Sequence, residues 1–140
     1  MALITLAATG PVRADPSVEG CIDETERGQA LRDEGELLAA RQAFLSCAEA
    51  GCPGLIRKDC IGWHAEVDAL VPSIVARAQD DSGRDLAGVV FRVDGEDVAL
   101  DGTPHELDPG THTLAWTHGE RTIEQSIVAR AGEKNRLVDV

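Results

Sequence analysis

Four cysteines have the clearest capacity for chemistry in this chain: Cys21, Cys47, Cys52 and Cys60. A redox dithiol would need the Cys-x-x-Cys spacing, which the sequence lacks, and no histidine stands at an interval that suits a zinc site. Small exported domains use an even number of cysteines as structural staples. We therefore expect these four residues to form two disulfides.

The expected helical hairpin around Gly35 favours one pairing of the cysteines. Cys21 precedes this glycine and Cys47 follows it at a similar separation, so an antiparallel hairpin brings both to a similar height. This favours Cys21–Cys47, with Cys52–Cys60 closing the next loop. The pairing Cys21–Cys52 with Cys47–Cys60 remains open, because sequence alone does not determine connectivity.

Histidines and acidic loops are the other groups that could bind a ligand. His112 and His118 flank one expected strand, and a neighbouring segment carries His105. Loop carboxylates offer the oxygen atoms that calcium prefers, at Asp80, Asp81 and Asp85, and at Asp94, Glu96, Asp97 and Asp101. Neither group follows the spacing of an EF-hand, and Asp-Gly pairs are typical of turns. We expect no metal site and no cofactor, and a calcium- or zinc-dependent protein or enzyme is the alternative.

The composition limits both the partners and the core. The formal charge is −12, and no part of the chain is strongly basic, so phosphate backbones and anionic membrane surfaces would repel it. The aromatic residues are few: Phe44, Phe91, Trp63 and Trp116. We expect both tryptophans to be buried, and either one would be the leading ligand contact if it proved exposed. In so small a core, each disulfide contributes about 2–4 kcal/mol.

The first 14 residues have the character of a signal peptide or its remnant. A short apolar run is followed by the small-residue pattern Val12-Arg-Ala14. No other stretch is long and apolar enough to span a bilayer. We expect an exported protein, periplasmic or extracellular, whose mature chain is soluble and does not insert into the membrane.

Helical periodicity covers residues 18–33, 36–50 and 56–70. In the first two of these segments, small and apolar residues stand in the mutual spacing of a tetratricopeptide repeat, namely Gly28, Leu31, Gly35, Leu37, Ala40 and Phe44. The hairpin therefore resembles one such repeat, in which Gly28 and Ala40 let the helices approach and Phe44 fills the space between them. A single repeat cannot bury its own faces, so we expect the third helix to cover it.

From residue 73 onward the periodicity changes to that of strands. Seven short segments alternate with turn sequences, which predicts a small antiparallel β-sandwich. Within it, Val93-Asp-Gly-Glu96, Gly102-Thr-Pro104 and Leu107-Asp-Pro-Gly-Thr-His112 follow one another in the order of a PEGA domain. Residues 86–140 thus resemble this group of carboxypeptidase-regulatory-like sandwiches, which implies a non-enzymatic envelope module. The whole layout resembles secreted proteins of myxobacteria.

The expected fold is α+β, with a disulfide-linked three-helix unit over residues 15–71 and a β-sandwich over residues 72–140. No serine stands in a Gly-x-Ser-x-Gly elbow, and no cysteine has the surroundings of a nucleophile. We expect no enzyme and no catalytic residue. The expected function is an exported binding or scaffolding module with a protein or cell-envelope partner. A structural subunit of a larger assembly is a further alternative.

Overall fold

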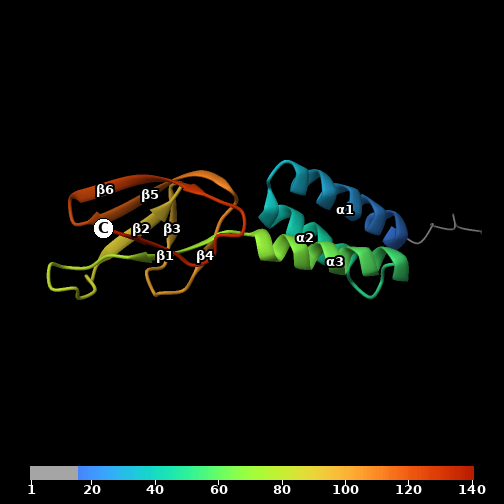
Figure 1. The fold of residues 1–140 in the computed structure, drawn as a ribbon, viewed down its shortest axis with the longest axis horizontal. Coiled ribbons are helices and arrows are strands. Elements are labelled where there is room, and N and C mark those ends of the chain that lie inside the picture. The colour runs from blue at the N-terminus through green and yellow to red at the C-terminus, as the bar shows by residue number, and fades with distance from the viewer. Residues whose placement is uncertain (1–15) are drawn as a thin grey trace, which may run out of the picture.

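The computed structural model describes residues 16–140, so the expected signal segment 1–14 lies outside the described residues. Three helices come first, and they are α1 (Pro16–Asp33), α2 (Leu37–Cys47) and α3 (Gly54–Leu70). Seven strands in two sheets follow, which confirms the α+β fold. The helices form one end of an elongated molecule and the strands form the other (Figure 1). None of the described helices has the length and apolar character needed to cross a membrane.

Helices α1 and α2 form an antiparallel hairpin that turns at Gly35. This glycine has a φ of +79°, and the N–H of Glu36 donates to the carbonyl of Leu31 at 2.9 Å, which closes the end of α1. The helices approach each other closely at Gly28, where an added Cβ would lie 2.5 Å from Cε1 of Phe44. The predicted close packing of Gly28 against Phe44 is confirmed.

Helix α3 covers the hairpin, as expected. Its Cys60 and Val67 are fully buried, together with Phe44 of α2. Trp63 is only partly buried, and its ring packs against that of Phe44 with the centroids 5.5 Å apart. Trp63 therefore packs against the helical core from its margin and is less buried than predicted.

The strands form two packed sheets. One sheet has the order β4-β1-β7 and the other β3-β2-β5-β6. The strands are β1 (Ser73–Arg77), β2 (Val89–Val93), β3 (Glu96–Val98), β4 (His105–Glu106), β5 (Gly110–His118), β6 (Arg121–Ala129) and β7 (Arg136–Asp139). Phe91 and Trp116 pack at the centre with their ring centroids 4.9 Å apart. Trp116 is buried, as predicted.

One strand pair departs from the predicted antiparallel pattern, since β1 and β7 run parallel. Both strands start at the helical end of the sandwich, where the N–H of Ser73 donates to the carbonyl of Glu133. They leave that end in the same direction, so the chain pairs them in parallel. The other four strand pairs are antiparallel.

Only two residues connect the helical unit to the sandwich. Val71 and Pro72 are both fully buried, and Val71 belongs to the helical core. Ile74, in the first strand, already belongs to the core of the sandwich. The chain therefore passes from one core into the next without a flexible linker.

Candidate functional site

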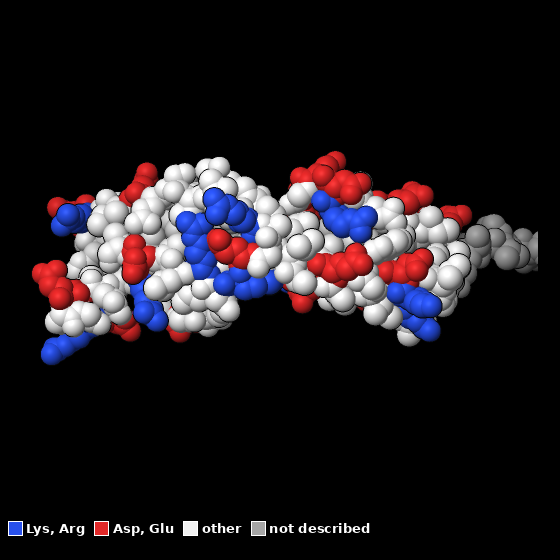
Figure 2. Space-filling model, in the orientation of Figure 1, with Lys and Arg blue, Asp and Glu red and all other residues white. Residues whose placement is uncertain are grey.

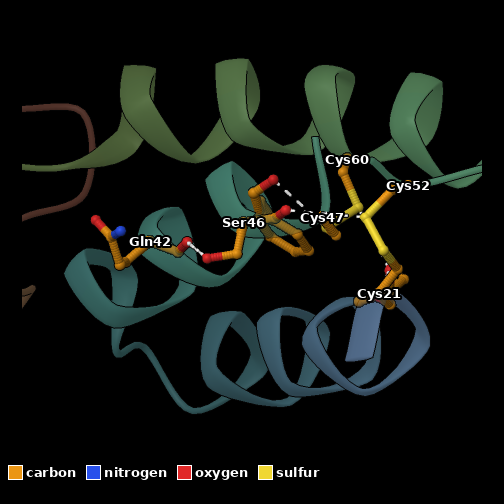
Figure 3. The surroundings of a disulfide bond; sticks show 8 residues. Cys21, Gln42, Ser46, Cys47, Cys52 and Cys60 are labelled. Carbon is orange, nitrogen blue, oxygen red and sulfur yellow. Dashed lines mark hydrogen bonds between the residues drawn. A yellow bond between two sulfur atoms is a disulfide. The ribbon is translucent and has the colours of Figure 1, made fainter. Parts of the chain in front are cut away.

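The four cysteines form two disulfides, Cys21–Cys52 and Cys47–Cys60, and no cysteine among the described residues is free (Figure 3). The prediction of two disulfides is confirmed, but the favoured pairing Cys21–Cys47 with Cys52–Cys60 is wrong. Helix α2 was expected to reach residue 50 but ends at Cys47, which turns toward α3 and bonds Cys60. The loop after it then carries Cys52 across to α1.

The sandwich caps the two helix ends that face it; we call this contact the junction. Oδ1 of Asp108, in the β4–β5 loop, accepts a hydrogen bond of 2.9 Å from the N–H of Leu38 in the first turn of α2. At the other end, Nζ of Lys134 donates to the carbonyl oxygens of Asp68 and Val71 at the end of α3. A carboxylate thus meets a helix N-terminus and an ammonium meets a helix C-terminus, which are the stabilising arrangements for the helix dipole.

Arg41 of α2 joins three elements at the same junction. Its Nη1 and Nη2 donate to the two carboxylate oxygens of Glu106 in β4 at 2.6 and 2.7 Å, and Nη1 also lies 2.8 Å from Oδ1 of Asp68 in α3. The hydrogen bonds with Glu106 raise the pKa of Arg41 above its ordinary value and hold the pKa of Glu106 below its own. On the face drawn in Figure 2, Lys and Arg gather on the sandwich beside this boundary.

His112 of β5 holds two loops at the junction. Its Nδ1 lies 2.6 Å from Oδ2 of Asp94, and its Nε2 lies 2.6 Å from the backbone carbonyl of Asp108. Both partners are acceptors, so the ring satisfies them only when both nitrogens carry protons. Burial lowers the pKa of His112, but the hydrogen bonds with Asp94 and Asp108 more than offset it and the pKa is raised overall. The same pairing holds the pKa of Asp94 below its ordinary value.

The acidic loops serve as turn acceptors. Oδ1 of Asp80 accepts from the N–H and hydroxyl of Ser82, and Oδ1 of Asp101 accepts from the N–H of Thr103 at 2.9 Å. Asp97 pairs with Arg92 along the β2–β3 hairpin. The described residues contain no group of three His, Cys, Asp or Glu side chains that could hold a metal ion.

The histidines are divided between separate places. His105 and His112 line one crevice of about 320 Å³ at the junction, beside Leu38 and Asp108. His118 lines a different cavity, described below. His105 and His112 therefore share one crevice, and His118 does not line it.

A second cavity, of about 330 Å³, opens at the end of the sandwich farthest from the helices; we call it the distal cavity. Trp116 forms part of its wall, and the indole Nε1–H of Trp116 is buried without a hydrogen-bond acceptor among the described residues. Such a donor is rare in a native core. The rest of the lining is apolar and polar in similar measure: Ala78, Gln79, Asp81, Leu86, Val89, His118, Arg121, Ile123 and Val140.

Sequence reasoning missed the junction. Arg41 lies on the second expected helix and Asp108 in the PEGA-like segment 107–112, and neither position signals these contacts, because both contacts join residues far apart in the chain. The one available signal was the lack of an Asx, Ser or Thr residue before α2, which left its first N–H groups in need of an outside acceptor.

No protein-family model matches this chain, and no curated protein matches it.

Proposed function

We propose that the protein is an exported, non-enzymatic binding or scaffolding module of the cell envelope, in which a helical unit holds a PEGA-like β-sandwich in a fixed orientation. The proposal rests on the junction. There, Arg41, Asp108, His112 and Lys134 are all engaged in joining the two units. These ionisable side chains fix the position of the helical unit against the sandwich.

The disulfides support the exported location. Two bridges close separations of 31 and 13 residues. Disulfides of this kind persist in the periplasm or outside the cell, and they are rare where glutathione keeps thiols reduced. The resemblance to PEGA and tetratricopeptide modules favours a protein or cell-wall partner over a small substrate.

The test is a pull-down of envelope material. The oxidised full chain is immobilised and exposed to cell-wall fragments and to solubilised envelope proteins. The same chain, reduced and alkylated, is the matched control. We expect enrichment of a partner on the oxidised chain alone, and equal recovery from both columns would contradict the proposal.

The metal-dependent alternative has a separate test. Thermal melts of the oxidised chain with calcium, with zinc and with EDTA should superimpose, because the carboxylates of Asp80, Asp94 and Asp101 already accept hydrogen bonds within the fold. A rise of several degrees with either metal would favour the alternative. Self-association of the pure chain would instead favour a structural subunit.

A further inference from the structure

Strand β6 is a long open edge. It is the last strand of the four-stranded sheet, and it pairs along its whole length with β5 alone. The other edge strands are shorter: β6 has nine residues, whereas β3, β4 and β7 have three, two and four. Natural sheets usually keep their edges short or covered, because an open edge is a template for another strand.

The direction of the free backbone groups follows from one contact. Nη1 of Arg136 donates to the carbonyl of Val128 at 2.9 Å, so this carbonyl points away from β5. In an antiparallel strand the N–H and C=O of one residue point the same way, and every second residue repeats the direction. Thr122, Glu124 and Ser126 therefore present their N–H and C=O groups along the open edge. Among the described residues, no backbone hydrogen bond outside the β5–β6 ladder reaches these three residues.

The distal cavity adjoins the beginning of this edge. Ile123 of β6 and Leu86 both line the cavity, and each of them is 38% exposed. A strand laid beside β6 would place alternate side chains on the same face as Ile123. One of them would then approach the cavity from the side of Ile123, which stands between the added strand and Trp116. Main-chain bonds along an edge and a pocket for one alternate side chain are the two parts of strand-addition recognition.

We propose that an extended peptide segment of a partner protein adds to β6 as a fifth strand, with one apolar side chain beside Ile123 at the distal cavity. We expect an uncharged segment, because Glu124 stands between Arg121 and Arg136 along the edge and the net charge of −12 disfavours an acidic partner. A second copy of this acidic chain would be repelled. The inference rests on the proposed binding role and names the surface and the kind of partner.

The experiment selects peptides and then removes one backbone donor. A random nonapeptide library displayed on phage is panned on the oxidised full chain, and the enriched peptides are measured on two variants of one position. Both variants replace the Glu124 side chain and lose its carboxylate, but Glu124→Pro also removes an N–H at the open edge that the β5 ladder does not use, whereas Glu124→Thr keeps that N–H. We expect peptides with alternating apolar residues, whose affinity falls by about tenfold or more in Glu124→Pro and changes little in Glu124→Thr.

A second variant tests the cavity. Leu86→Glu places a charge at its opening and should also weaken the selected peptides by about tenfold. If Glu124→Pro fails to fold, N-methylation of alternate residues in a selected peptide replaces it. Methyl groups on the edge-facing residues should abolish binding, and those on the intervening residues should not.

Several results would overturn the inference. The first is a library that yields no enriched peptides. The second is equal peptide affinity for Glu124→Pro and Glu124→Thr. The third is self-association of the chain that Glu124→Pro removes and Glu124→Thr does not, because the occupant of the edge would then be a second copy. Envelope pull-down without any dependence on Glu124→Pro would place the partner elsewhere and leave the proposed function standing. Failure of the pull-down, together with strong peptide binding that Glu124→Pro weakens, would contradict the proposed function and leave the inference about the β6 edge standing.

Discussion

Gly28 lies where the helical hairpin is most tightly packed, and adding a single methyl group there tests that packing. In Gly28→Ala, the new Cβ would lie 2.5 Å from Cε1 and 2.7 Å from Cδ1 of Phe44. The Phe44 ring is fully buried and packs against Trp63 on another side, so it has little room to move. Overpacking of this kind costs about 1–3 kcal/mol, while alanine in a helix gains up to about 1 kcal/mol over glycine. We expect a net loss of about 1–2 kcal/mol in the free energy of unfolding.

Gly20 provides the matched control within the same helix. An added Cβ at Gly20 meets nothing within 4 Å, so Gly20→Ala should show the helix preference alone and stabilise the chain by about 0.5–1 kcal/mol. Urea denaturation of the two oxidised variants measures both effects as shifts of the midpoint in opposite directions. A midpoint that rises equally in both variants would refute the close packing of α1 against α2.

Three further perturbations test the junction and the disulfides. Arg41→Ala should lower the free energy of unfolding by only about 1 kcal/mol, since the acidic partners of Arg41 are partly exposed. Arg27→Ala is the control, because it loses only an exposed ion pair and should have no measurable effect. The urea midpoints of the two variants are compared. His112 stabilises the fold fully below its ordinary pKa of 6.5, and this contribution is lost as the pH rises through its higher folded pKa. The wild-type melting temperature should therefore fall across that range, and a His112→Gln variant with the same fall would exclude this cause. Replacing both Cys21 and Cys52 by Ala should lower the free energy of unfolding by about 3–4 kcal/mol, because their disulfide closes a separation of 31 residues. An unchanged urea midpoint would contradict this.

The elements of the fold could be predicted from the sequence because their signals are local. The spacing of Gly28, Gly35 and Phe44 reports a helical hairpin within one stretch of chain. The alternating residues and turns after residue 73 report the strands in the same way. Each of these signals depends on neighbours within a few residues, and the structure contains all three helices and all seven strands.

The errors concern contacts between distant residues. The predicted disulfide pairing assumed a second helix that continues past Cys47, whereas α2 ends at Cys47, which bonds Cys60, and the loop after it carries Cys52 to Cys21. The parallel pairing of β1 with β7 depends on the junction, which fixes where both strands start. Asp108 in a turn and Arg41 on a helix give no local sign that they meet at the junction, so the candidate site was not visible in the sequence.

The open edge of β6 was likewise beyond local reasoning. A strand was predicted over residues 122–129, but nothing in their order says that only one neighbour pairs with them. The exposure of Ile123 and the unpaired Nε1–H of Trp116 also depend on the packing of both sheets. These features became evident only when the strands were placed in their sheets.

The disulfide frame supports both the fold of the helical unit and the proposed exported location, and peptide mapping tests it directly. The chain is purified from an oxidising compartment, alkylated without reduction, digested and analysed by mass spectrometry. We predict bridged peptides for Cys21–Cys52 and Cys47–Cys60 and no alkylated cysteine. A bridge between Cys21 and Cys47 would contradict the helical frame, and two or more free thiols would contradict both that frame and the exported location that rests on the disulfides.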